Sequence, residues 1–105
     1  SLLKMFFEGR KYKVECAEDG RAALLMLSEL TYLPDLILLD AQMPEMNGYE
    51  FREEQKKFVR LRNIPLVVMT GDSSAEMYEQ MKCPEGILIK PLRLDSVLEK
   101  VLPFL

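Results

Sequence analysis

The stretch Leu36-Ile37-Leu38-Leu39-Asp40 decides the fold, because four apolar residues run together without alternation and stop at a carboxylate. A strand of this kind is covered on both faces, which is typical of a parallel sheet with helices on each side. Two more apolar runs have the same form: residues 64–69 stop at Thr70, and residues 87–89 stop at Lys90. These runs predict buried parallel strands that each end in a polar side chain.

Amphipathic helical patterns alternate with these strands. Apolar residues are spaced by three or four over residues 23–30 and again over residues 94–102. Two further helices are expected to end near Arg62 and at Met81. This alternation predicts an α/β fold with a doubly wound parallel sheet in three layers, α/β/α. The expected helix caps are Asp19, Asn47 with Glu50, and Ser73 with Glu76.

The amino-terminal part of the chain is organised differently. Residues 2–7 are mostly apolar and are followed by Gly9, which is typical of the last turns of a helix. Residues 12–16 alternate between apolar and charged side chains, which predicts a half-buried strand. Strand–helix units begin with a strand, so a leading helix predicts that the first strand is absent from this sequence. We expect residues 1–105 to be a single domain truncated at its amino end, and Ser1 in place of Met fits this expectation.

Composition excludes several classes of function. The 105 residues suffice for one domain. With 14 Lys and Arg against 17 Asp and Glu, the net charge is −3, so the chain lacks the clustered positive charge that nucleic acids and anionic membranes require. It contains no His, which excludes catalytic sites built on imidazole and the usual zinc sites.

Two further features of the sequence bear on the cellular compartment of the protein. No apolar stretch approaches the roughly 18 to 20 residues that a membrane-spanning helix needs. Cys16 and Cys83 are too few for a disulfide framework, and we expect both to be reduced thiols. These features predict a cytoplasmic protein.

Three polar residues follow the predicted strands and form a candidate site. Ligands of open α/β sheets bind beyond the carboxyl ends of the strands, and neighbouring strands lie about 4.8 Å apart. Asp40, Thr70 and Lys90 are therefore expected within side-chain reach of one another. A carboxylate can act as a nucleophile toward phosphorus, and lysine and hydroxyl groups stabilise the transferred phosphoryl group. A divalent cation usually completes such a site.

The loop Leu38-Leu39-Asp40-Ala41-Gln42-Met43-Pro44-Glu45-Met46-Asn47-Gly48 resembles the phosphoacceptor loop of response regulator receiver domains, the CheY-like family. Met69-Thr70-Gly71 and Ile89-Lys90-Pro91 match that family at the following strands, and Asp19-Gly20 with Ala23-Leu24 resembles its second helix. The resemblance covers nearly the whole chain. It implies a flavodoxin-like fold and a phosphoacceptor signalling domain of two-component phosphorelays rather than an enzyme.

The resemblance also implies roles for particular residues. Asp40 would accept a phosphoryl group from the phosphohistidine of a sensor histidine kinase or phosphotransfer protein, and then switch the domain's contacts with a downstream effector. Lys90 would pair with a phosphoryl oxygen, and Thr70 would be the switch hydroxyl. Asp40 and the backbone carbonyl of Gln42 would bind Mg²⁺. The Lys90-Pro91 peptide bond would be cis.

Two departures from the family pattern affect the expected function. Ile87 stands at the switch position where the family usually has Tyr or Phe. The acidic pair that binds the metal follows the family's first strand, which is missing here. Glu18 and Asp19 are expected to cap and solvate a helix rather than replace that pair. We therefore predict that this chain binds Mg²⁺ weakly and is phosphorylated poorly.

Two alternatives stay open, together with a structural expectation. A receiver-like docking module without phosphoryl chemistry would explain Ile87 and the missing acids. A phosphatase of the haloacid dehalogenase type is the enzyme alternative, but it requires a second Asp where this chain has Gln42. Loss of a central strand would also expose two strand edges, which predicts self-association.

Overall fold

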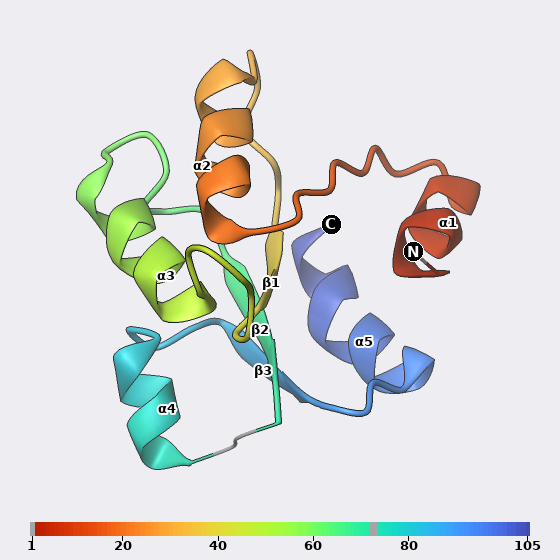
Figure 1. Ribbon diagram of the computed structural model, residues 1–105. Helices are drawn as coiled ribbons and strands as arrows, with labels where there is room; N and C mark the ends of the chain where they lie inside the picture. The colour runs from red at the N-terminus through yellow and green to blue at the C-terminus, as the bar shows by residue number, and fades with distance from the viewer. Residues whose placement is uncertain (1, 72–73) are drawn as a thin grey trace.

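The fold is a parallel sheet covered by helices, in a computed structural model that describes residues 2–71 and 74–105. Its strands are β1 (Ile37–Asp40), β2 (Leu66–Thr70) and β3 (Gly86–Ile89), in the spatial order β1-β2-β3 (Figure 1). β1 and β3 both pair with β2 in parallel, with Ile37 opposite Leu66 and Val67 opposite Gly86. The carboxyl ends of all three strands therefore lie at the same edge of the sheet. The doubly wound, flavodoxin-like α/β prediction is confirmed.

Helices cover both faces of this sheet. One core cluster joins the inner faces of α2 (Gly20–Glu29), α3 (Gly48–Lys57) and α4 (Ala75–Gln80) to β1 and β2. A second cluster joins α1 (Leu2–Gly9) and α5 (Leu94–Val101) to the opposite face, and η1 (Leu102–Phe104) follows α5. The three predicted layers are therefore present, with a separate apolar core on each side of the strands. Within the described ranges, no helix has both the length and the apolarity for a membrane crossing.

The strand predicted at residues 12–16 is wrong. In the structure this segment follows a turn at the end of α1, and its first amide, that of Tyr12, donates to Phe7 O at 3.0 Å. The predicted alternation of burial is also missing, since Val14 is half-buried whereas Tyr12 and Cys16, which should share its face, are exposed. A strand is defined by its partner, and the described residues supply no neighbouring strand for this segment. A pattern of side chains alone could not reveal that.

Two helix boundaries also differ from prediction. Asn47 and Glu50 form the predicted capping box, but α3 ends at Lys57 instead of continuing to Arg62. The side chain of Gln55 explains the early end, because its Nε2 donates to Leu61 O and Ile64 O, both at 3.1 Å, and holds the following residues in turns. The cap of α4 is Ser74, whereas the predicted Ser73 lies outside the described residues.

Candidate functional site

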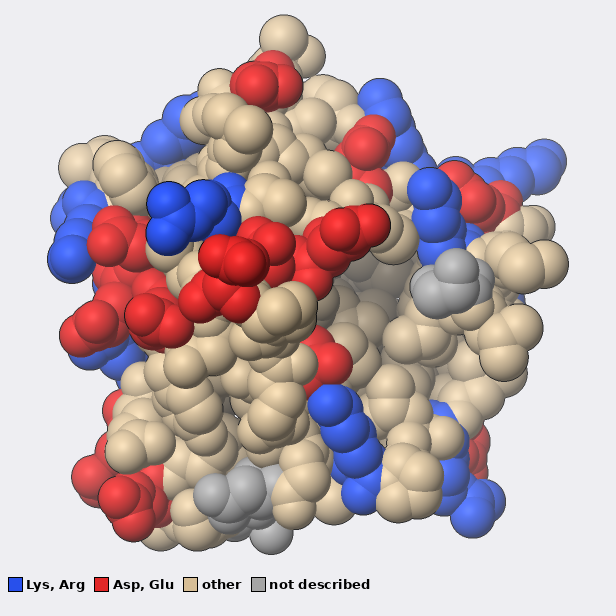
Figure 2. All heavy atoms as spheres, in the orientation of Figure 1, with Lys and Arg blue, Asp and Glu red and all other residues tan. Residues whose placement is uncertain are grey.

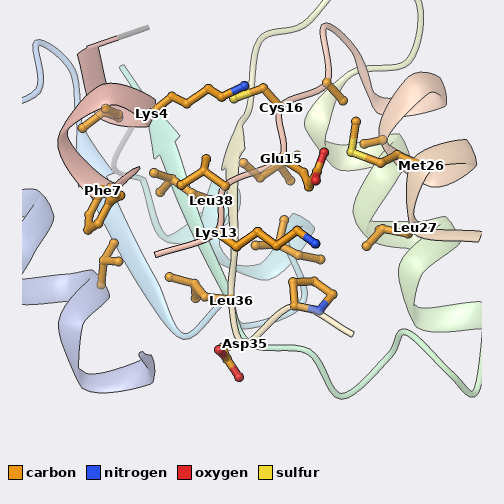
Figure 3. A pocket seen from close by; sticks show the side chains of 18 of the residues that line it. Lys4, Phe7, Lys13, Glu15, Cys16, Met26, Leu27, Asp35, Leu36 and Leu38 are labelled. Carbon is orange, nitrogen blue, oxygen red and sulfur yellow. The ribbon is translucent and has the colours of Figure 1, made fainter. Parts of the chain in front are cut away.

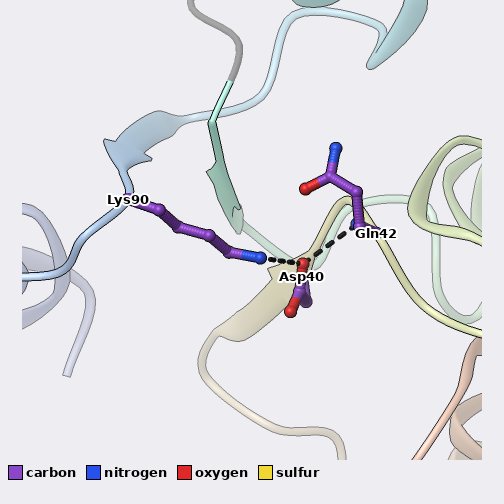
Figure 4. Close-up of polar contacts among 3 residues, drawn as sticks. All are labelled: Asp40, Gln42 and Lys90. Atoms are coloured by element: carbon purple, nitrogen blue, oxygen red, sulfur yellow. Dashed lines mark hydrogen bonds and ion pairs between the residues drawn. The ribbon is translucent and has the colours of Figure 1, made fainter.

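Asp40 and Lys90 meet at the carboxyl edge of the sheet. Lys90 Nζ lies 2.7 Å from Asp40 Oδ1, and both side chains are about one-third exposed (Figure 4). The same carboxylate oxygen accepts a hydrogen bond of 2.9 Å from the backbone N–H of Gln42, whose side chain points away from it. Two donors thus hold the carboxylate in place while leaving it open to solvent.

Thr70 ends the strand between those that carry Asp40 and Lys90. Its carbonyl accepts from the backbone N–H of Lys90 at 2.9 Å, which fixes the start of the lysine side chain beside β2. The Thr70 side chain is fully buried, unlike those of its two neighbours. The structure therefore places all three predicted residues on one edge, with Asp40 and Lys90 in direct contact. The Lys90-Pro91 bond that follows is cis, as the resemblance implied.

The loop after Asp40 is positioned by close backbone contacts. The N–H of Gly48 donates to Ala41 O at 3.1 Å, and a Cβ at position 48 would come within 2.9 Å of Asp40 O, so no larger residue fits without displacing the site. On the other side of the loop, Gly20 N donates to Met46 O at 3.1 Å. Glycine at position 48 is thus required by the close approach of the chain to the carboxylate.

A buried polar network next to the site was missed by sequence reasoning. Arg52 is fully buried in α3, where its Nε donates to Met81 O at 2.8 Å, its Nη1 to Gln55 Oε1 at 2.9 Å and its Nη2 to Lys82 O at 3.2 Å. Burial lowers the pKa of Arg52, whereas the negative charge of Glu85 acts in the opposite direction. The network ties the helix that follows the Asp40 loop to the end of α4.

A signal for this network is present in the sequence. Gly48, Phe51, Arg52 and Gln55 are spaced by three, four and seven residues and share one face of α3. All four are buried. Polar residues at core positions of a helix indicate an internal hydrogen-bond network, but the carbonyl partners lie about 30 positions away and only the fold brings them close.

The described residues do not fit a tight Mg²⁺ site. Mg²⁺ prefers six oxygen ligands in near-octahedral geometry. Within the described residues, no three of the Asp, Glu, Cys and His side chains lie close enough together to hold a metal. Asp19 accepts a hydrogen bond from Ala22 N at 2.8 Å and caps α2. Of the predicted ligands, Asp40 is already paired with Lys90, and Gln42 would contribute one carbonyl oxygen.

Acidic side chains nevertheless gather near this edge of the molecule. Figure 2 shows a band of Asp and Glu over the starts of α2 and α3, with Lys and Arg scattered around it. The negative potential of this band favours cations over a free anionic phosphoryl donor. The Lys90 ammonium group is the positive charge directly at the carboxylate.

Ile87 lies on β3 opposite Val68 of β2. It is half-buried and packs against the core cluster formed with α2, α3 and α4. Ile87 has no aromatic ring that could rotate between an exposed and a buried position. This departure from the family pattern therefore removes the usual aromatic switch at this position.

Comparison with known proteins identifies relatives along nearly the whole chain. Residues 1–102 match the response regulator receiver domain family. The chain is 27% identical to the chemotaxis protein CheY4 of Vibrio cholerae, with a TM-score of 0.86 over 99% of this chain and 87% of that one. It shares its fold, at 20% identity and a TM-score of 0.81, with the receiver domain of sensor histidine kinase PA1611 from Pseudomonas aeruginosa PAO1, over 98% of this chain and 84% of that one. That structure has a magnesium ion coordinated in the active site cleft.

The chain also resembles part of a much larger protein. It is 30% identical to the autoinducer 2 sensor kinase/phosphatase LuxQ of Vibrio harveyi, over 98% of this chain. The match spans only 12% of LuxQ. The likeness therefore concerns one domain of that protein and not its kinase or phosphatase activity.

Proposed function

This chain belongs to the response regulator receiver domain family, and from that premise we propose that Asp40 is the residue on which it accepts a phosphoryl group. Receiver domains are signalling domains of two-component phosphorelays, and this chain acts in that kind of signalling. One observation carries the assignment of Asp40: Lys90 Nζ lies 2.7 Å from its carboxylate at the open edge of the sheet. A carboxylate beside a fixed ammonium group has both the nucleophile and the charge that phosphoryl transfer needs.

In the proposed reaction an Asp40 oxygen attacks the phosphorus of a phosphohistidine. The O–P bond forms, the N–P bond breaks, and the histidine nitrogen keeps the electron pair of that bond. The ammonium group of Lys90 moves from the carboxylate to the phosphoryl oxygens and neutralises part of their charge. The Thr70 hydroxyl, which is fully buried here, acts as the switch that moves to the phosphoryl group and becomes the second donor. Residues 1–105 contain no His, so the donor histidine lies outside them, and we propose that it belongs to a sensor histidine kinase or phosphotransfer protein of the cytoplasm.

We also propose that Mg²⁺ binds weakly to these residues. The family binds Mg²⁺ in its active site, as the PA1611 receiver domain illustrates. Here Asp40 and the carbonyl of Gln42 provide few of the oxygen ligands that Mg²⁺ prefers. Slow and incomplete phosphorylation of this chain follows, because the carboxylate then keeps more of its repulsion toward an anionic donor.

Phosphorylation by acetyl phosphate with Mg²⁺, followed by intact mass, tests both proposals. We expect a slow, partial gain of one phosphoryl group that is lost in Asp40→Asn. Asp35→Asn is the matched control, since Asp35 is an exposed carboxylate that precedes the same strand, and it should behave like the unaltered chain. Persistence of the modification in Asp40→Asn would refute the assignment, and near-complete modification would refute weak Mg²⁺ binding.

A docking module without phosphoryl chemistry is the second candidate function. Two observations favour it: the described acids form no metal-binding group, and Ile87 replaces the usual aromatic switch residue. This candidate predicts no phosphoryl gain under the same conditions, even after prolonged incubation. The enzyme alternative is not supported, because the family is a signalling family and Gln42 stands where a phosphatase acid would be required.

A further inference from the structure

The loop that follows Asp40 borders a groove and also contacts the residue after α4. The groove, of about 470 Å³, separates β1 from residues 12–16, and Figure 3 shows its lining from close by. Gly48, at the end of the loop, and Met81, after α4, are not among the residues that line the groove. The contact between the loop and the end of α4 is therefore independent of the groove.

Met81 brings the end of α4 against the Asp40 loop. It follows α4 directly and is fully buried. A Cβ placed on Gly48 would lie 3.1 Å from Met81 Cε and 2.9 Å from Asp40 O, so the Met81 methyl group and the Asp40 backbone share the space beside this glycine. Close-packed interiors transmit displacements. A shift of Met81 is therefore passed on to the backbone of Asp40.

The backbone directly after Met81 is strained. Lys82 and Cys83 both have a φ of 53°, in the left-handed region that residues other than glycine rarely adopt. Such conformations persist where the surrounding structure holds them. The amides of this turn bond back to α4, since Lys82 N donates to Glu79 O at 2.9 Å and Cys83 N to Tyr78 O at 3.2 Å. Its carbonyls lie beyond the last turn of the helix and need donors from elsewhere.

Arg52 of α3 supplies donors to two of these carbonyls. Its Nε donates to Met81 O at 2.8 Å and its Nη2 to Lys82 O at 3.2 Å. The two carbonyls belong to the peptide groups on either side of the Lys82 Cα, so one planar guanidinium group fixes both peptide planes around a strained residue. A third bond, from Nη1 to Gln55 Oε1 at 2.9 Å, holds the guanidinium group on α3. The position of Met81 therefore depends on Arg52.

We propose that Arg52 is a positioning residue for phosphoryl transfer to Asp40 and that it acts through Met81. By fixing the turn after α4, Arg52 keeps the methyl group of Met81 against Gly48. That contact holds the Asp40 backbone where its carboxylate meets Lys90, and small misplacements of reacting groups slow a reaction strongly. The effect on rate rests on the proposed function of Asp40, whereas the effect on the loop can be measured without it.

Phosphorylation by acetyl phosphate with Mg²⁺, followed by intact mass, tests the effect on rate. We expect Arg52→Met to slow modification of Asp40 by about tenfold. Val101→Ala is the matched control, because Val101 ends α5 and is buried in the core on the opposite face of the sheet from Met81. It should destabilise the fold in urea unfolding and leave the rate unchanged where both variants are fully folded. Equal slowing in the two variants would overturn the proposal.

Met81→Leu tests the path between Arg52 and the loop. The substitution keeps the apolar volume and the backbone carbonyl that Arg52 binds, but it replaces the terminal methyl group beside Gly48. We expect it to slow phosphorylation about as much as Arg52→Met does. The double variant should be no slower than the slower single variant, because both changes act on one path. Effects that multiply in the double variant would contradict a path through Met81.

Amide hydrogen exchange reports the geometry of the loop without any phosphorylation. The N–H of Gly48 donates to Ala41 O at 3.1 Å and closes the loop. In Arg52→Met we expect this amide to exchange about tenfold faster relative to the amides of β2, because the loop opens more often. In Val101→Ala the ratio should stay unchanged.

The two measurements separate the two proposals. Absence of phosphorylation in the unaltered chain would refute the proposed function of Asp40, and exchange at Gly48 would still decide whether Arg52 holds the loop. Unchanged relative exchange at Gly48 in Arg52→Met would overturn the positioning role, even if Asp40 is phosphorylated normally in the unaltered chain.

Discussion

The two sides of β1 differ in what their neighbours contribute. On the β2 side, four residue pairs are in parallel register and Leu66, Val67 and Val68 are fully buried. On the other side, residues 12–16 have a suitable alternation of residue types but face a groove and pair with no strand in the described part of the chain. Both sides have apolar side chains, and only one has a ladder of hydrogen bonds. Strand formation in this protein therefore depends on the partner more than on the pattern.

The largest expected effect lies on the paired side. Leu66→Ala removes a fully buried side chain of the central strand and should lower the free energy of unfolding by about 2–5 kcal/mol. Urea unfolding followed by circular dichroism measures it. A loss below about 1 kcal/mol would show that the β2 core is as loosely packed as the groove, which would remove the contrast between the two sides.

Lys90→Met tests whether the ion pair at the end of the paired strands contributes to phosphorylation of Asp40 more than to the stability of the fold. Losing the ammonium group should slow phosphorylation of Asp40 by roughly a hundredfold, by analogy with the loss of one stabilising donor. The ion pair, about one-third exposed, contributes less than about 1 kcal/mol to stability. Mass spectrometry of the acetyl phosphate reaction gives the rate, and urea unfolding gives the stability. An unchanged rate would contradict the assigned role of Lys90.

Arg52→Met tests the network that connects the site to α4. The substitution keeps the apolar bulk but leaves the carbonyls of Met81 and Lys82 without their guanidinium donor, so we expect a loss of about 1–3 kcal/mol. Arg62→Met is the control, because Arg62 is exposed, and should change stability by less than about 0.5 kcal/mol. Equal effects in the two variants would mean that the buried network does not stabilise the fold.

The smallest effect is expected on the open side. Val14 is half-buried and borders the groove, so Val14→Ala should cost less than about 1 kcal/mol in urea unfolding. A cost above about 2 kcal/mol would show that residues 12–16 already belong to the core.

Most of the fold could be predicted because its signals are local. Asn47 with Glu50 formed the predicted capping box, and Asp19 capped α2. The apolar runs before Asp40, Thr70 and Lys90 became the three strands of the sheet. The failures concern contacts that the pattern of side chains does not reveal. Gln55 ended α3 early through carbonyls that follow it in a turn, and residues 12–16 lacked a partner strand.

By itself, the sequence determined the three buried strands, the caps of α2 and α3 and the polar residues at the strand ends, because these depend on neighbours a few positions apart. Only the tertiary structure decided that Lys90 reaches Asp40 at 2.7 Å, that Arg52 is buried, and that the edge of β1 opens onto a groove. Those properties depend on which segments share a space, and hydrogen bonds and burial are completed only when the chain has packed.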